Sequence, residues 1–172
     1  EQGMFEKAVS DYDNVIRTNP KYYFAFEETG ILEWHFGNWT DARKYFTKAL
    51  EISPANISYT LTVAACYIKE NNMTAAKTLL EKAMKPLDRQ SLDYEMLRLY
   101  HDQGGINAEN SVALKTEKEE NTTKRGRMQY YLGLYYELKG LNEVATEYYT
   151  KVAQIKTPQF FEYRIAEWGL KK

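Results

Sequence analysis

The chain has 172 residues, with 23 Lys and Arg against 24 Asp and Glu, two His, one Cys and four Pro. A formal net charge of −1 argues against a nucleic-acid binder, which normally carries a basic stripe. One Cys cannot form an internal disulfide, and one Cys with two His cannot build a Cys/His zinc site. Apolar runs are too short to span a bilayer. Aromatic residues make up 15% of the chain, which suits helices packed through aromatic rings.

The sequence repeats itself at an offset of 34 residues, as the separation of Ala8, Ala42 and Ala76 shows. A further copy, which contains Gly133 and Ala145, lies 69 residues after Ala64 and Ala76, or two periods plus one inserted residue. Other aligned sets are Tyr12, Phe46 and Leu80; Val15, Ala49 and Ala83; and Pro20 with Pro54. A fixed period of this length indicates a stack of structural repeats.

Each repeat has the pattern of two helices joined by a tight turn. Apolar residues recur at spacings of three and four, which place them on one helix face. Gly37, Asn71 and Gly140 then stand where a left-handed residue ends a helix. Pro20 and Pro54 mark the end of the second helix of a pair. One such pair cannot bury its own apolar face, so we expect the pairs to stack.

The residues of the second and last repeats resemble the tetratricopeptide-repeat pattern. The matching positions are Phe26, Thr29 and Gly30, then Gly37, Trp39, Ala42, Phe46, Ala49 and Pro54, and again Leu132, Gly133, Tyr136, Gly140, Ala145 and Tyr149. Glu33 departs from the pattern, because Tyr is usual at that position. The resemblance implies an all-α, right-handed superhelical solenoid of antiparallel helix pairs. It covers almost the whole chain and is weakest over residues 86–126.

The predicted elements follow in chain order within a single repeat domain over residues 1–172. Residues 1–20 are a partial repeat with one helix near 5–18, which suggests a fragment of a longer chain. The expected boundaries are 22–53 and 56–85 for two full repeats, 91–119 for a degenerate one, 127–156 for the last, and 158–172 for a capping helix. Residues 116–127 are polar and charged, and they are predicted to form a flexible link.

A second resemblance covers about 45 residues at the carboxyl end. The segment from Tyr130 to Gly140, followed by the segment from Phe160 to Ala166, is similar to the tail of bacterial new-lipoprotein-I-type tetratricopeptide-repeat proteins. Those proteins are envelope adaptors that bring cell-wall endopeptidases and proteases together. The resemblance implies an adaptor lipoprotein of the bacterial envelope as one alternative.

In the tetratricopeptide-repeat pattern the first helix of each pair lines the concave surface, and this implies a set of candidate partner-binding residues. They are Phe24, Glu27, Ile31 and Trp34 in the second repeat, Ser58, Leu61, Ala65, Ile68 and Lys69 in the third, and Arg127, Tyr130, Leu134 and Glu137 in the last. The aromatic members are plausible anchors, because rings bring large contact area at low entropic cost. Packing against neighbouring repeats is the alternative role for some of them.

The positions that hold a terminal carboxylate in chaperone-binding members of the family carry no cationic side chain here. Such recognition needs fixed cationic donors, and Glu27 and Glu28 would repel a carboxylate. We therefore expect an apolar or basic peptide, or a partner helix, in the groove.

The sequence offers little for catalysis. His35 and His101 lie on different predicted helices, and Cys66 follows small residues, which favours an inert buried thiol. No phosphate-binding glycine loop and no zinc-protease motif occurs. We therefore predict a protein that is not an enzyme, with no catalytic residue, no cofactor and no metal site.

The sequence predicts a non-catalytic interaction scaffold or adaptor that binds a peptide or partner helix in its concave groove. A regulatory module of a larger protein with a catalytic domain elsewhere is a second possibility, and a carrier of an apolar ligand between repeats is a third. Self-association through the open amino-terminal end is a further possibility, because the apolar face around Val9, Tyr12 and Ile16 needs cover. Both the cytoplasm and the bacterial periplasm or envelope are compatible with one Cys.

Overall fold

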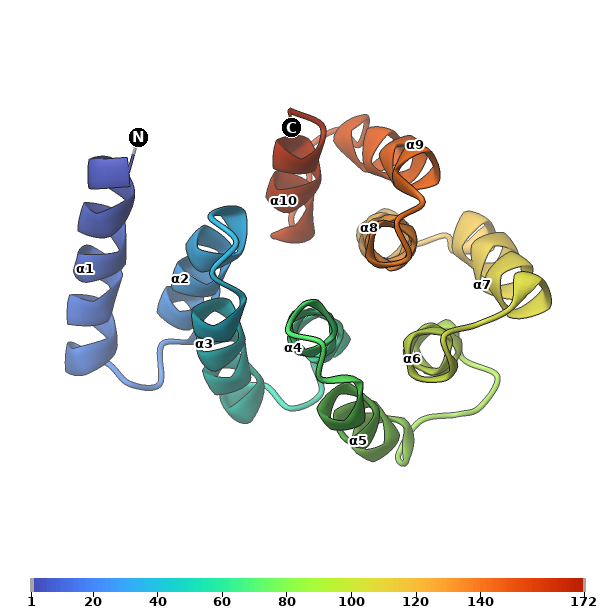
Figure 1. The fold of residues 1–172 in the computed structure, drawn as a ribbon, viewed down its shortest axis with the longest axis horizontal. Coiled ribbons are helices and arrows are strands. Elements are labelled where there is room, and N and C mark those ends of the chain that lie inside the picture. Colours follow the sequence, from blue (N-terminus) through green and yellow to red (C-terminus); the bar gives the residue numbers. More distant parts are fainter. Residues whose placement is uncertain (1, 172) are drawn as a thin grey trace. The chain divides into compact units, whose positions relative to one another are not determined.

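The structure is a computed structural model that describes residues 2–171, and over this range it contains ten α-helices and no strand (Figure 1). The predicted all-α fold of antiparallel helix pairs is therefore confirmed. The helices are α1 (Gln2–Thr18), α2 (Tyr23–His35), α3 (Trp39–Ile52), α4 (Ile57–Lys69), α5 (Met73–Met84), α6 (Leu92–Asp102), α7 (Ile106–Lys118), α8 (Thr122–Leu138), α9 (Asn142–Ala153) and α10 (Glu162–Gly169).

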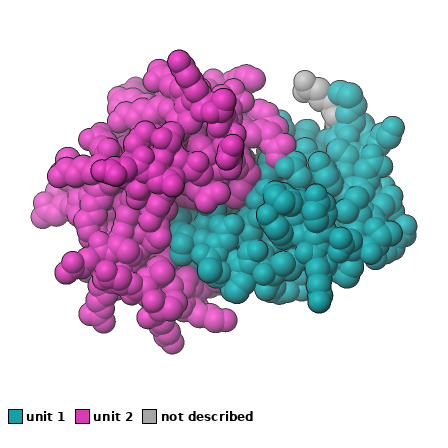
Figure 2. All heavy atoms as spheres, turned by 180° about the vertical axis from the view of Figure 1, so that it is seen from behind, with its two compact units in different colours: residues 1–73 teal, residues 74–172 magenta. Residues whose placement is uncertain are grey.

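The chain divides into two compact units at the start of α5, and Figure 2 shows each in its own colour. The first unit contains α1 to α4 and the second contains almost all of α5, together with α6 to α10. The division into repeats that the sequence suggests stays a prediction.

The first unit is built around the α2–α3 pair, which a short turn connects. Gly37 ends α2 with a left-handed φ of 78°, and its amide N–H donates to the carbonyl of Trp34 over 3.1 Å. The missing side chain of Gly30 lets the helices approach, because a Cβ there would lie 3.0 Å from the Phe46 ring. Asn71 in the first unit and Gly140 in the second have φ values of 59° and 75°, so all three left-handed turns predicted from sequence are confirmed.

The end helices of the first unit differ in how deeply they pack. Helix α4 starts at a side-chain cap, since the Asn56 carboxamide oxygen accepts a hydrogen bond from the Ser58 amide at 3.0 Å. Nine residues of α4 are buried, from Ser58 to Cys66 without a break. Helix α1 contacts α2, but none of the residues 3–18 is buried. The amino-terminal helix therefore keeps an apolar side in contact with solvent.

In the second unit α8 and α9 pack as closely as α2 and α3 do in the first. A Cβ at Gly133 would lie 2.7 Å from the Tyr149 ring, so only glycine fits this crossing without a shift. Helix α10 packs against both α8 and α9. Its Glu162 is fully buried and accepts a hydrogen bond from the Tyr131 hydroxyl at 3.1 Å. The last helix thus covers the end of the α8–α9 pair.

The α6–α7 pair departs from this scheme. Helix α7 buries Glu109, Val112 and Thr116, whereas α3 and α9 each bury an aromatic ring between small or aliphatic residues. Two consecutive residues after α6, Gln103 and Gly104, have positive φ values of 56° and 47°. The degenerate repeat therefore has its own turn and its own contact between the helices.

The predicted flexible link over residues 116–127 is wrong. Helix α7 extends to Lys118 and α8 begins at Thr122, so only three residues separate the helices. The Asn121 side chain caps α8 by accepting from the Lys124 amide at 2.9 Å. Thr116 is buried, and a Cβ at Gly126 would lie 2.6 Å from Ile155 and Phe160. The charged residues of this stretch therefore belong to the ends of α7 and α8. Packing of the buried faces of these two helices stabilises them despite the polar composition of the stretch.

Candidate partner-binding surface

Three consecutive aromatic residues mark the start of α2 and include the most exposed of the predicted contact residues. The Phe24 ring stacks on Tyr23 at a centroid distance of 4.2 Å and lies 5.7 Å from Tyr22. Phe24 remains 44% exposed and Tyr22 46%. These large rings therefore stay in solvent while they support one another.

Farther along α2 the predicted residues point into the first unit. Ile31 is fully buried, and Trp34 is only 5% exposed. The Trp34 ring meets the Trp39 ring of α3 edge to face, with centroids 5.0 Å apart. The Lys69 ammonium lies 5.6 Å from the centre of the Trp34 ring and 4.5 Å from that of Trp39. Trp34 therefore joins α2 and α3, and Lys69 of α4 covers both indoles through cation–π contacts.

The contact between α2 and α4 brings the second and third predicted repeats together. The Tyr59 hydroxyl of α4 donates to a Glu27 carboxylate oxygen of α2 at 2.6 Å. Ser58, Leu61 and Ala65 on α4 are buried, whereas Ile68 keeps part of its surface exposed. The predicted residues of α2 and α4 thus form one group. The half-buried Glu27 carboxylate lies near one end of this group, and the Lys69 ammonium lies near the other.

The four predicted residues of α8 lie in the second unit. Tyr130 is buried and stacks on Tyr149 of α9 at 5.7 Å, and the Tyr149 hydroxyl donates to Glu137 at 2.6 Å. Leu134 is fully buried, and the Arg127 side chain lies 3.9 Å from the Glu162 carboxylate of α10. Tyr130 and Glu137 therefore join α8 to α9, and Arg127 joins α8 to α10.

Burial divides the thirteen predicted contact residues into two groups. The buried ones are Ile31, Trp34, Ser58, Leu61, Ala65, Tyr130 and Leu134. Those that retain accessible surface are Phe24, Glu27, Ile68, Lys69, Arg127 and Glu137. In each unit the first group packs the helices together, and the second group keeps side-chain surface in contact with solvent.

Sequence reasoning missed Tyr22 and Tyr23, which extend the exposed aromatic cluster around Phe24. The signal was present, because three aromatic residues in a row cannot all point to one side of a helix. Tyr22 precedes α2, so its ring does not have to lie on the helix face that packs against α3.

Two titratable groups, Cys66 and Glu109, serve packing contacts. Burial raises the pKa of the Cys66 thiol far above its usual range, which keeps the thiol protonated and unreactive. Glu109 has a lowered pKa although burial opposes this, because Lys139 donates to it at 2.7 Å and Tyr135 at 2.9 Å. Each group is thus matched to a structural partner or to a closed apolar site.

Over residues 2–171 we find no cluster of three or more His, Cys, Asp or Glu side chains that could hold a metal ion. None of the described helices combines the length and the apolar character needed to cross a bilayer.

Repeated antiparallel helix pairs with left-handed caps define a helical-repeat protein, a class that serves as a scaffold for protein partners. Tetratricopeptide-repeat family models match residues 1–57 and residues 34–98. The chain therefore belongs to the tetratricopeptide-repeat family, as the sequence pattern predicted.

The chain is also similar to several individual proteins. Tetratricopeptide repeat protein 6 from Homo sapiens is 37% identical over 54 residues, which are 31% of this chain and 10% of that protein. One crystal structure of MamA aligns with a TM-score of 0.48 and 22% identity over 89% of this chain and 83% of MamA. A second MamA structure gives a TM-score of 0.47 and 20% identity over 89% of each chain. The chain thus spans a small part of its human relative.

Proposed function

We propose that the chain is a non-catalytic adaptor that binds a peptide or partner helix along the first helices of its repeats, α2 and α4 in the first unit. The observation that carries the proposal is the exposed Phe24 ring at the start of α2, held by its stack on Tyr23. Such a ring loses little conformational freedom when it binds, so most of its buried area contributes to affinity.

The charges beside Phe24 favour a partner with an apolar anchor and at least one basic group. Glu27 lies one helical turn after Phe24 and keeps part of its surface exposed. Its carboxylate accepts a hydrogen bond from the Tyr59 hydroxyl at 2.6 Å, which holds the carboxylate in one position. A fixed carboxylate next to an exposed ring suits a basic or amphipathic segment.

Selection of peptides from a displayed random library, followed by calorimetry, tests the proposal. Phe24→Ala should weaken the binding of the selected peptides by about 1–3 kcal/mol, the usual effect of removing an aromatic anchor. Phe36→Ala is the matched control, because Phe36 is 41% exposed but belongs to the other end of α2. Equal effects of the two variants, or a library that yields no saturable binder, would contradict the proposal.

We also propose that two copies of the chain associate through α1. The apolar side of this helix keeps contact with solvent, and Met4 is 73% exposed. A further apolar contact would shield Val9, Tyr12 and Ile16, which are only half-buried. Sedimentation equilibrium should give a dimer that Tyr12→Glu dissociates, whereas a monomer at all concentrations would contradict this second proposal.

A further inference from the structure

Residues of the α6–α7 pair and of the segment before α6 line an open pocket of about 370 Å³ within the second unit. Leu99 from α6 and Ala108 and Val112 from α7 supply its apolar lining. Arg89, Arg98 and Asp102 supply charged groups at its edge. The pocket lies within the size range of small-ligand sites, roughly 300–1,000 Å³, and combines an apolar surface with a few polar groups.

Helix α7, which lines the pocket, has no aromatic residue. In the α2–α3 and α8–α9 pairs a ring from the second helix fills the contact with the first, as Phe46 does against Gly30 and Tyr149 against Gly133. Helix α7 has the sequence INAENSVALKTEK, and its buried residues include the polar Glu109 and Thr116. Glu109 accepts hydrogen bonds from Tyr135 of α8 and from Lys139, which directly follows α8, so its side chain is directed toward α8. No ring of α7 is therefore present to fill the space beside α6.

The carboxylates of the pocket already have cationic partners. Glu95 accepts from Lys115 at 2.7 Å and from Ser111 at 3.2 Å. Asp102 accepts from Arg98 at 3.0 Å and lies 2.7 Å from the His101 ring.

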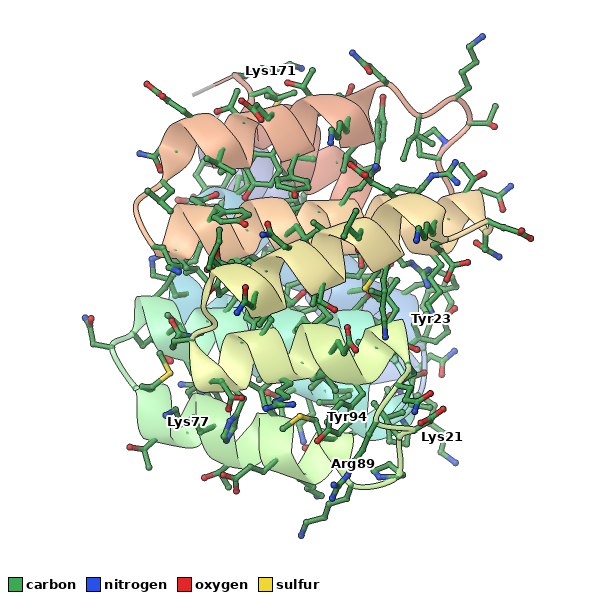
Figure 3. All side chains as sticks on the ribbon, turned by 90° about the vertical axis from the view of Figure 1, so that its right-hand side faces the viewer. Lys21, Tyr23, Lys77, Arg89, Tyr94 and Lys171 are labelled. Carbon is green, nitrogen blue, oxygen red and sulfur yellow. The ribbon has the colours of Figure 1, made fainter. Side chains whose placement is uncertain are left out.

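Arg89 is different, because no described carboxylate forms an ion pair with it. It is exposed on the segment that leads into α6, where Figure 3 shows it near the end of the helix that carries Tyr94. The pocket therefore offers an apolar floor and one guanidinium that is not neutralised.

We propose that this pocket binds an aromatic side chain of a peptide partner, with an acidic residue next to it that pairs with Arg89. The inference rests on the proposed scaffold function and adds a second contact site, with an acidic rather than a basic preference. The partner would supply in trans the ring that α3 and α9 supply within their own pairs. Charge complementarity selects the acidic neighbour, because a carboxylate matches the guanidinium geometrically.

An NMR titration of the isotope-labelled full chain with blocked dipeptides tests the inference directly. Acetyl-Phe-Asp-amide should shift the backbone amide signals of Leu99, Ala108 and Val112 with a saturable Kd on the order of 1 mM. Acetyl-Phe-Asn-amide keeps the ring without the charge and should bind about fivefold more weakly. Acetyl-Ala-Asp-amide keeps the charge without the ring and should bind at least about tenfold more weakly.

Two variants with matched controls test the site itself. Ala108→Trp fills the pocket from an exposed position and should weaken acetyl-Phe-Asp-amide by about tenfold or more, whereas Leu114→Trp on the exposed side of α7 should leave its affinity unchanged. Arg89→Glu should reduce the affinity by about fivefold, whereas Lys77→Glu, which changes an exposed cation of α5, should not.

Signals that do not saturate, or that move equally with the alanine dipeptide or with both members of a variant pair, would overturn the inference. The scaffold proposal fails separately, because it depends on Phe24 and on library-selected peptides. If selected peptides bind through Phe24 while the dipeptides do not bind the pocket, only the pocket inference is refuted. If the dipeptides bind the pocket while no peptide depends on Phe24, the pocket is supported and the α2–α4 site is refuted.

Discussion

Arg43 of α3 donates to Glu70, the residue that follows α4, through two nitrogen atoms at 2.7 and 3.3 Å. The guanidinium also lies 4.6 Å from the centre of the Tyr67 ring. This paired contact joins the second helix of one pair to the first helix of the next. Both side chains are less than a quarter exposed, so solvent screens the ion pair only partly.

Arg43→Lys should therefore destabilise the chain by about 1 kcal/mol, because lysine cannot make the forked contact or stack on Tyr67 in the same way. Urea unfolding followed by circular dichroism measures the loss. Lys48→Arg is the control, since Lys48 forms an exposed pair with Glu51 within one helix. An Arg43→Lys midpoint equal to that of the wild type would show that the contact adds no stability.

The same pair predicts a loss of stability in acid. Burial alone would raise the pKa of Glu70, but hydrogen bonds from Arg43 and Thr40 lower it below the ordinary value of 4.5. A lowered carboxylate pKa contributes stability that is present above about pH 4.5 and is lost as the pH falls through the folded value. Glu70→Gln should reduce the dependence of the unfolding free energy on pH, measured between pH 2 and 6. An unchanged pH dependence would contradict a stabilising role of the Glu70 carboxylate.

Gly133→Ala should destabilise the second unit by about 1–3 kcal/mol. A Cβ at this position would meet the Tyr149 ring at 2.7 Å, and the cost of overpacking exceeds the gain in helix propensity of about 1 kcal/mol. Gly3→Ala is the control, because no atom lies within 4 Å of a Cβ there. In thermal unfolding the midpoint temperature of Gly3→Ala should equal or exceed that of the wild type, and that of Gly133→Ala should be lower. The reverse order would refute the close approach of α8 and α9 at Gly133.

Trp34→Ala should cost about 3 kcal/mol or more of unfolding free energy, because the indole is buried against Trp39 and Lys69. Phe24→Ala should cost less than about 1 kcal/mol, since its ring is largely exposed and makes few buried contacts. Denaturant titration of both variants separates a residue that holds the helices together from one whose ring remains accessible to solvent. Similar losses in the two variants would contradict the assignment of Trp34 to the packed interior and of Phe24 to the exposed surface.

His101 should titrate above its ordinary pKa of 6.5. A hydrogen bond with Asp102 is the largest cause, and a second one with Glu81 of α5 adds to it. The raised pKa contributes stability that is fully present below about pH 6.5 and is lost as the pH rises through the folded value. NMR titration of the imidazole measures the pKa directly, and Glu81→Gln should lower it. The effect on stability should stay below about 1 kcal/mol, because Glu81 and Asp102 are well exposed to solvent.

A tetratricopeptide-type helical fold could be predicted from sequence because its signals are local or periodic. Gly37, Asn71 and Gly140 end helices through backbone conformations that few side chains permit, and these appear directly in the sequence. Ala42 and Ala145 recur where paired helices cross, so the repeat is visible without coordinates. The link over 116–127 was mispredicted because polar composition reports exposure to water and does not distinguish a loop from the outer face of a helix.

The candidate site depended on tertiary structure, because one repeat pattern is compatible with several side-chain environments. Sequence alone placed Phe24 and Trp34 on the same helix with the same predicted role, yet one is exposed and the other is packed between α2 and α3. The pairing of Arg43 with Glu70, 27 residues away, follows from how one helix pair meets the next. The α6–α7 pocket likewise arises from how two helices meet without an aromatic ring between them. Periodicity therefore determined which helices form, while contacts between residues far apart in sequence decided which side chains remain available to a partner.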